Sequence, residues 1–195
     1  MKPIIFLGTL LCALFLSPTA QADSAPLDLV YNSNDNDEPP EYKKLECALH
    51  ISPVQDARNN KLSLGTKGLG GGFGEPILSG DVAGWIDSGL KSMPLWGHTL
   101  LDERLANSSN KLIVIQPTVY YSYLWFASLR INATLVMSVN YHLPSGETQQ
   151  IQYRMLGSKN NWVGADGELV TTLNFALNKA ITKMDRDVRG LCQKI

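Results

Sequence analysis

The last long segment of the chain, residues 168–191, is the feature that most constrains the fold. Its apolar residues recur at steps of three and four, which is the spacing of one apolar stripe on an α-helix. Acidic residues (Asp166, Glu168) open the segment and basic ones (Arg186, Arg189) lie near its end, as the helix macrodipole favours. A stripe of this length needs an apolar layer beneath it. The stripe consists of Leu169, Leu173, Ala176, Leu177, Ala180, Ile181, Met184, Val188 and Leu191.

Three segments upstream alternate apolar and polar residues, as strands with one buried face do. They span residues 111–126, 131–142 and 150–155, and the turn sequence 143–147 joins the last two as a hairpin. In the first of them Tyr121 is expected on the buried face with Ile113, and Pro117 indicates an edge or a bulge. Residues 45–51 predict an earlier strand, and residues 79–93 predict a helix that Pro94 ends.

The expected order of elements is therefore β-α-β-β-β-α. We predict an α+β two-layer sandwich, in which two helices lie on one face of a roughly four-stranded, mainly antiparallel sheet. Residues 45–195 form this single domain. Residues 23–44 are polar, acidic and proline-broken, which predicts a disordered leader. A short pairing around residues 27–31 is the alternative for part of it.

Residues 1–22 have the pattern of a secretory signal peptide that is cleaved after Ala22. Lys2 precedes an apolar run that is too short for a comfortable membrane span, and small residues close it. An uncleaved anchor is the alternative. Leu11, which precedes Cys12, is not the small residue that lipid attachment requires. The pattern predicts an exported, periplasmic protein that carries no lipid and no transmembrane span after cleavage.

Cleavage leaves Cys47 and Cys192, and two cysteines in an oxidising compartment usually form a disulfide. Two separate buried thiols are the alternative. Removing Lys2 with the leader leaves sixteen basic and eighteen acidic residues, a net charge of −2. That balance does not suit a nucleic-acid-binding or membrane-surface protein.

No chemistry-bearing pattern is present. His50, His98 and His142 lack a second ligand at metal spacing, and no nucleophile and base recur in a known arrangement, so we expect no metal, no cofactor and no catalytic residue. His50 and His142 are expected as solvated strand histidines.

Residues 65–74 are glycine-rich, but they match neither phosphate-binding loop pattern, which predicts a mobile loop. Asp56 and Arg58 predict a local salt bridge that shapes a turn.

Aromatic residues cluster at the end of the segment 111–126. They occupy both faces of the expected strand, so some of them cannot pack under the helices. Core and strand-end packing is one interpretation. The other is an interaction surface, because aromatic side chains anchor protein interfaces. The residues of this predicted surface are Tyr120, Tyr123, Trp125 and Phe126.

These observations favour a non-enzymatic envelope protein that acts as a binding or assembly module for another envelope protein or for itself. Two alternatives remain open. One is a carrier of a small hydrophobic or lipidic ligand, in a cavity beneath Trp85, Met93, Met137 and Met184. The other is an enzyme whose site is not recognised.

The sequence also resembles the YajG-type lipoproteins of Gram-negative bacteria. The resemblance lies in the run 130–139, the turn Pro144-Ser-Gly146, Tyr153-Arg154 and the helix 173–185, with the turn 52–58 in addition. That family carries a cysteine for lipid attachment, which this chain lacks, so the resemblance implies a soluble periplasmic relative. It implies a fold and a compartment, and it brings no chemistry with it.

Overall fold

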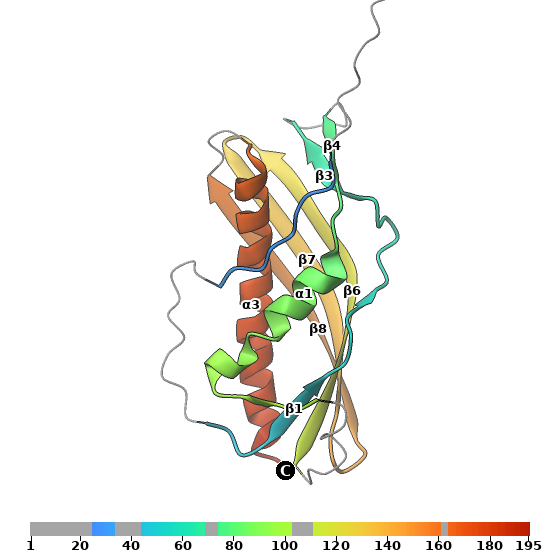
Figure 1. Cartoon of the computed structure of the whole chain (residues 1–195), viewed down its shortest axis with the longest axis vertical. Helices are drawn as coiled ribbons and strands as arrows, with labels where there is room; N and C mark the ends of the chain where they lie inside the picture. Colours follow the sequence, from blue (N-terminus) through green and yellow to red (C-terminus); the bar gives the residue numbers. More distant parts are fainter. Residues whose placement is uncertain (1–24, 34–43, 69–73, 103–110, 161–163) are drawn as a thin grey trace, which may run out of the picture.

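The computed structural model describes residues 25–33, 44–68, 74–102, 111–160 and 164–195 (Figure 1). Three long strands form the main part of the sheet: β6 (Leu112–Ala127), β7 (Arg130–His142) and β8 (Thr148–Asn160). They are antiparallel neighbours in the order β6–β7–β8. Alternate residues of β7 from Ile131 to Tyr141 are fully buried, as the period of two in the sequence predicts.

Five shorter strands complete the sheet on the other side of β6. The strands β1 (Ala48–Ile51), β2 (Gln55–Asp56) and β3 (Ser63–Lys67) pair with β6 in parallel. The strand β5 (Thr99–Leu100) pairs in parallel with β1, and β4 (Glu75–Leu78) pairs antiparallel with β3.

The prediction of a four-stranded, mainly antiparallel sheet was therefore wrong in strand number and in strand direction. The sheet has eight strands within the described residues, and four of the seven strand pairings are parallel. Strands of two to five residues contain too few positions for a period to be visible. Their direction depends on connections along the chain, which local alternation does not encode.

Two helices lie on one face of this sheet, which confirms an α+β fold (Figure 1). The helix α1 (Val82–Leu90) begins at Asp81, whose carboxylate accepts a hydrogen bond from the Gly84 N–H at 2.8 Å. The 3₁₀ helix η1 (Met93–Trp96) follows it. The helix α3 (Asp166–Cys192) runs along the sheet, and every residue of its predicted apolar stripe is buried.

The core fills the space between the helices and the sheet. Its members come from α1, α3 and the inward face of every long strand. The four side chains proposed to lie around a ligand cavity, Trp85, Met93, Met137 and Met184, belong to this core and are at most 1% exposed.

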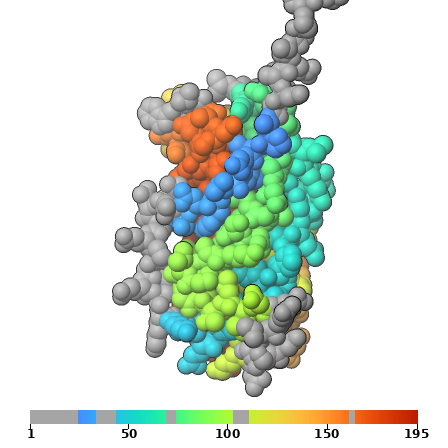
Figure 2. Space-filling view, viewed as in Figure 1, coloured from blue at the N-terminus to red at the C-terminus, as the bar shows by residue number. Residues whose placement is uncertain are grey.

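Residues 25–33 fall within the predicted disordered leader, yet they pack against the domain. The N–H of Leu27 donates to the Leu78 carbonyl at 3.0 Å, and the Leu27 side chain is buried. The Tyr31 hydroxyl donates to Asn178 on α3 at 2.8 Å, and the Asn174 amide donates to the Val30 carbonyl at 3.0 Å. Figure 2 shows this segment lying between α3 and the chain around α1. The predicted signal peptide and residues 34–43 lie outside the described residues.

The predicted glycine-rich loop is described only at its ends, because residues 69–73 lie outside the described part. Gly65 on β3 has a φ of 138°, which is a backbone conformation that favours glycine. A Cβ atom there would lie 2.1 Å from the Leu124 carbonyl oxygen. Glycine therefore allows β3 to approach β6 closely.

Gly157→Ala is expected to destabilise the protein by about 1–3 kcal/mol, as overpacking of a tight contact does. A Cβ atom on Gly157 of β8 would lie 2.2 Å from the Thr172 carbonyl oxygen of α3, so the helix would have to move off the sheet. Gly190→Ala is the matched control, because a Cβ there meets nothing within 4 Å and alanine favours the helix. Urea unfolding should show a lower midpoint for Gly157→Ala only. Equal midpoints for both variants would contradict the contact.

Candidate functional site

The open face of the sheet, opposite the helices, changes character at a β-bulge in β6. The register with β7 shifts between Val119 and Tyr121, so Tyr120 has no direct partner. Before the bulge the odd-numbered residues of β6 point into the core, and after it the even-numbered residues Ser122 and Leu124 do so. The expectation that Tyr121 shares the buried face with Ile113 was therefore wrong: Tyr121 is 45% exposed.

Beyond the bulge, β6 places three aromatic side chains on the open face. Tyr121, Tyr123 and Trp125 occupy alternate positions, and the Tyr121 and Tyr123 rings stack with their centroids 5.7 Å apart. Across the strands, Val136 pairs with Tyr121, and Leu156 of β8 lies in the row of Tyr123. Leu156 is 56% exposed. We call these five residues the aromatic patch.

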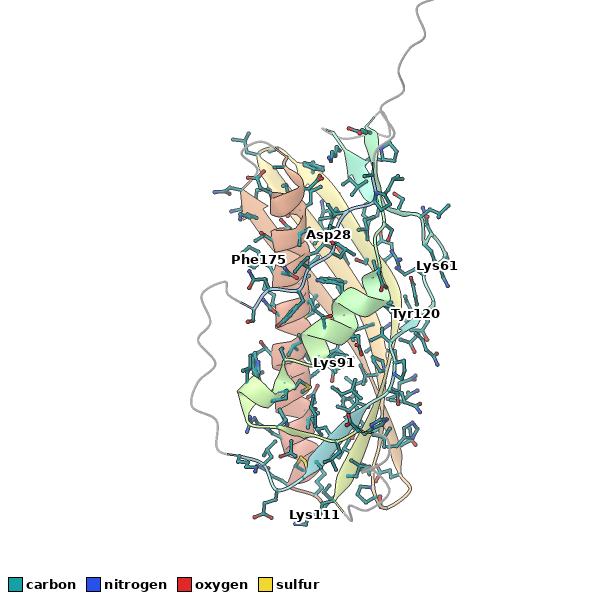
Figure 3. All side chains as sticks on the ribbon, viewed as in Figure 1. Asp28, Lys61, Lys91, Lys111, Tyr120 and Phe175 are labelled. Atoms are coloured by element: carbon teal, nitrogen blue, oxygen red, sulfur yellow. A yellow bond between two sulfur atoms is a disulfide. The ribbon has the colours of Figure 1, made fainter. Side chains whose placement is uncertain are left out.

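The residues of the predicted interaction surface divide between the two faces of β6. Tyr123 and Trp125 belong to the aromatic patch and are half-buried. Tyr120, at the bulge beside the patch, is 48% exposed (Figure 3). Phe126 packs against the core instead, because the bulge turns the even-numbered positions inward. Sequence analysis missed Tyr121, because Pro117 indicated an edge or a bulge in this strand but no residue marked its position at Tyr120.

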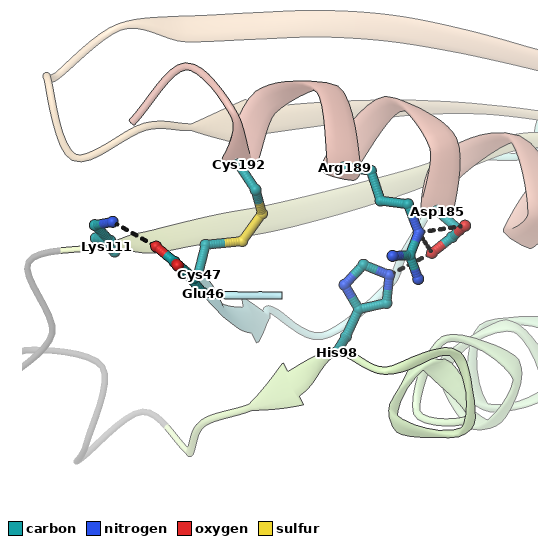
Figure 4. Close-up of a disulfide and its surroundings, with 7 residues drawn as sticks. All are labelled: Glu46, Cys47, His98, Lys111, Asp185, Arg189 and Cys192. Atoms are coloured by element: carbon teal, nitrogen blue, oxygen red, sulfur yellow. Dashed lines mark hydrogen bonds and ion pairs between the residues drawn. A yellow bond between two sulfur atoms is a disulfide. The ribbon is translucent and has the colours of Figure 1, made fainter. Parts of the chain in front are cut away.

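A buried polar cluster connects the segment after η1 to the end of α3 (Figure 4). The His98 ring nitrogen Nε2 lies 2.5 Å from the Asp185 carboxylate, and Arg189 Nε donates to both oxygens of that carboxylate at 3.0 Å. Arg189 also donates to the Trp96 carbonyl. Burial opposes ionisation of Asp185, but the hydrogen bonds from His98 and Arg189 and their charges outweigh it and lower the pKa of this carboxyl.

The position of this cluster suits a structural role. His98 is 4% exposed and Asp185 is 3% exposed, so a substrate has no access to either side chain. The cluster holds the connector before β5 against α3. No sequence pattern indicated it, because its members are separated by 87 residues along the chain.

The disulfide Cys47–Cys192 lies at the same end of the molecule (Figure 4). Its Cα atoms are 5.6 Å apart, within the usual range for a disulfide. It joins the residue before β1 to the last residue of α3, across 145 positions of the chain. The pair is therefore placed to hold the terminal helix on the sheet.

A second buried network connects β7, β8 and α3. The Tyr153 hydroxyl donates to Asp187 at 2.8 Å, and the Tyr141 hydroxyl lies 2.6 Å from that of Tyr153. Because the Asp187 carboxylate accepts from Tyr153, Tyr141 donates to Tyr153. Burial raises the pKa of both phenols. Both tyrosines remain neutral and act as a hydrogen-bonded contact between the sheet and the helix.

The predicted local salt bridge between Asp56 and Arg58 is confirmed. Arg58 donates to both carboxylate oxygens, at 3.0 and 2.8 Å, and to the Ser79 hydroxyl at 3.2 Å. These hydrogen bonds outweigh partial burial and lower the pKa of Asp56. The bridge fastens the exit of β2 to the chain before α1.

The two strand histidines are half-buried on the open face, where they flank Val114 in one row of the sheet. His50 Nδ1 lies 3.1 Å from the Leu101 carbonyl oxygen, and His142 Nδ1 lies 2.8 Å from the Thr148 hydroxyl. Both rings therefore have protein partners and are not simply solvated. Among the described residues no group of three His, Cys, Asp or Glu side chains is arranged to hold a metal ion.

A shallow pocket of about 280 Å³ lies where the end of β8 meets α3. Its lining residues are Arg130, Ser158, Lys159, Asn160 and Phe175. Two cations and one aromatic ring make it suitable for a carboxylate on a short apolar stem. In the described part of the chain, neither helix has the length and apolarity that a membrane crossing requires.

No protein family model matches the sequence, and no curated protein sequence matches it either. The fold is similar to that of protein XCC0632 from Xanthomonas campestris, which is described as a DUF330 protein. The TM-score is 0.55 at 9% identity, and the alignment covers 86% of this chain and 94% of that one.

Two further solved structures are less similar. PelC from Paraburkholderia phytofirmans, a dodecamer, has a TM-score of 0.43 at 10% identity over 72% of this chain and 90% of its own. A minor lipoprotein from Acinetobacter baumannii has a TM-score of 0.43 at 10% identity over 75% and 93%. Because these two TM-scores are below 0.5, we compare the fold only with that of the Xanthomonas protein. At 9% identity that likeness concerns the fold alone, so this chain has the α+β fold of XCC0632.

Proposed function

We propose that this protein is a non-enzymatic binding or assembly module of the bacterial cell envelope, and that it binds its partner through the aromatic patch. The observation that carries the proposal is the exposure of the patch. Tyr121 and Leu156 are about half exposed on a face that neither helix covers, while the helix side of the sheet is fully packed. Exposed aromatic side chains that lie together are typical of protein interfaces.

The rest of the molecule supports a scaffold role. The buried groups with perturbed pKa values have partners within the fold: Asp185 of α3 bonds to His98 and Arg189, and Tyr141 bonds to Tyr153, which bonds to Asp187 of α3. Such networks rigidify a fold and hold a surface in place. We therefore retain the proposal that the chain is not an enzyme.

The disulfide supports an extracytoplasmic location, because disulfides persist in oxidising compartments. With the signal sequence of residues 1–22, this favours a periplasmic protein that is cleaved after Ala22 and not lipidated. The partner is then another envelope protein or a second copy of the chain.

Photo-crosslinking tests the patch. A benzoylphenylalanine at position 123, within the patch, is expected to yield one defined adduct in the exported protein. The same residue at position 62, where Leu62 is 80% exposed outside the patch, serves as the matched control. The adduct mass separates a second copy from another protein. An equal yield of the same adduct at both positions, or no adduct at position 123, would contradict the proposal.

Truncation of the patch gives the size of the effect. Tyr121→Ser with Trp125→Ser is expected to weaken partner binding by about 2 kcal/mol or more, which is roughly thirtyfold, as loss of interface anchors does. Isothermal titration with the captured partner measures this change. Leu62→Ser is expected to leave the affinity unchanged, because it removes an exposed apolar side chain outside the patch.

A further inference from the structure

The strand β8 forms a long open edge of the sheet. It has 13 residues and, in the described part of the chain, pairs with β7 alone and without a register shift. The opposite side of the sheet ends in the short strands β4 and β5, of four and two residues. A long, regular edge strand is a template on which another extended chain can pair.

The contact between Lys179 and β8 shows which backbone groups point outward. Lys179 Nζ on α3 donates to the Leu156 carbonyl oxygen at 2.8 Å, so this oxygen points away from β7. In an antiparallel pair, both backbone groups of one residue point to the same side, and the direction alternates along the strand. The outward groups therefore belong to the even-numbered residues from 150 to 158.

This edge is surrounded by positive charge, although the whole chain has a net charge of −1. Three cations, Lys179, Lys183 and Arg186, lie exposed along α3 at helical spacing, and Lys183 lies 5.8 Å from the centre of the Tyr153 ring. Arg154 and Lys159 belong to β8 itself. The carboxylate of Asp187, which accepts from Tyr153, keeps its negative charge, but the five cations outnumber it. Glu147 lies at the turn before β8.

The spacing of Lys179 and Lys183 is close to the side-chain repeat of an added strand. Lys179 and Lys183 are separated by about 6 Å along the helix axis, at 1.5 Å per residue. Side chains on one face of a strand repeat about every 6.6 Å. The helix α3 packs against β8 and crosses it obliquely (Figure 1), so side chains of a strand added to this edge would come close to the cations of the helix.

We propose that the β8 edge binds an extended acidic segment of a partner protein, which adds to the sheet as a further strand. Its acidic side chains occupy alternate positions and face Lys179, Lys183 and Arg186, while its other side chains continue the open face. The pocket of about 280 Å³ at the end of β8 receives a carboxylate between Arg130 and Lys159, against the Phe175 ring. The two surfaces share Leu156, whose side chain lies in the aromatic patch and whose backbone lies at the edge. The aromatic side chains of the patch lie on β6, two strands away from this edge, so the two proposals can fail independently.

Lysine side chains along the β8 edge also oppose the pairing of β8 with neutral or basic strands. The same charges that protect β8 from self-association therefore select an acidic partner, because only an acidic strand neutralises them. Two copies of β8 would bring Arg154 and Lys159 of each chain into one sheet, which like-charge repulsion opposes.

The test uses the mature full chain and a fluorescent peptide of alternating glutamate and threonine, about twelve residues long to match β8. Fluorescence anisotropy is expected to show binding that weakens with salt. A peptide with lysine in place of glutamate should not bind. Methylation of alternate backbone nitrogens, which removes strand hydrogen bonding and leaves the charge, should abolish binding. Hydrogen exchange should slow at the even-numbered amides from 150 to 158.

Two variants locate the site on the protein. Lys183→Glu is expected to weaken peptide binding about tenfold, whereas Lys61→Glu, the same charge change at an exposed position elsewhere, should not. Gln152→Pro removes one outward N–H and should also weaken binding, with its thermal midpoint checked for folding. Tyr121→Ser should leave peptide binding unchanged. Equal binding of the methylated peptide, no binding at all, or binding to anionic phosphatidylglycerol vesicles in place of the peptide would overturn the proposal.

Discussion

Replacing Cys47 and Cys192 together by alanine is expected to lower the free energy of unfolding by about 2–4 kcal/mol. The disulfide closes a loop of 145 residues, for which chain entropy alone sets an upper value of roughly 5 kcal/mol. Alanine suits both positions, because Cys47 is 2% exposed and Cys192 packs against the core. The measurement is urea unfolding with and without a reductant.

The single and double variants make this prediction specific. Cys47→Ala alone should lose as much stability as the double variant, because either change breaks the same link. A reductant should bring the wild-type protein to the level of the variants and leave the variants unchanged. The slope of the unfolding free energy against urea should increase when the link is absent, since the unfolded chain then exposes more surface. If the reductant leaves the unfolding free energy of the wild-type protein unchanged, the disulfide does not stabilise the fold.

Long, regular patterns in the sequence predicted most of the scaffold. The alternation of β7 continues without a break from Ile131 to Tyr141, so its buried face follows from the residues. The stripe of α3 predicted both its helical state and its buried side. Asp81 and Pro94 marked the region of α1 because capping and proline effects are local. These signals depend on neighbours in the chain, which a single sequence displays.

The features that sequence analysis missed depend on contacts that are remote in the chain. The bulge at Tyr120 reverses the faces of the second half of β6, and one extra residue in a β-prone run leaves no mark in the composition. Leu27 and Tyr31 belong to the short apolar run 27–31, for which sequence analysis left a short pairing open. The partners of these two residues on β4, α1 and α3 are remote in the chain, so the sequence does not show what buries them. The candidate site depends on this bulge, so only part of the aromatic patch was predictable.

Asp185→Ala is expected to cost about 3–5 kcal/mol, because removing one partner of a buried ion pair leaves the other charge uncompensated. His98 Nε2, which is nearly inaccessible to water, and Arg189 Nε, on a partly buried side chain, would both lose their acceptor. Asp185→Asn keeps an oxygen acceptor of the same shape and should cost less. Lys91→Ala, which removes an exposed ion pair with Asp87 at 2.6 Å, is the surface control and should cost below about 1 kcal/mol.

The pH dependence of stability tests the same cluster through a different property. The pKa of Asp185 is lower in the folded protein than in the unfolded chain, so its ionised form stabilises the fold above the ordinary aspartate pKa. This stability is lost as the pH falls from about 4 through the folded pKa, because the carboxyl then takes up a proton that the fold disfavours. Asp185→Asn should flatten the thermal-midpoint curve in this range. A residual slope should remain, because the pKa of Asp56 is also lowered by Arg58. If the wild-type and Asp185→Asn curves run parallel below pH 4, the carboxylate is not what connects the segment around His98 to α3.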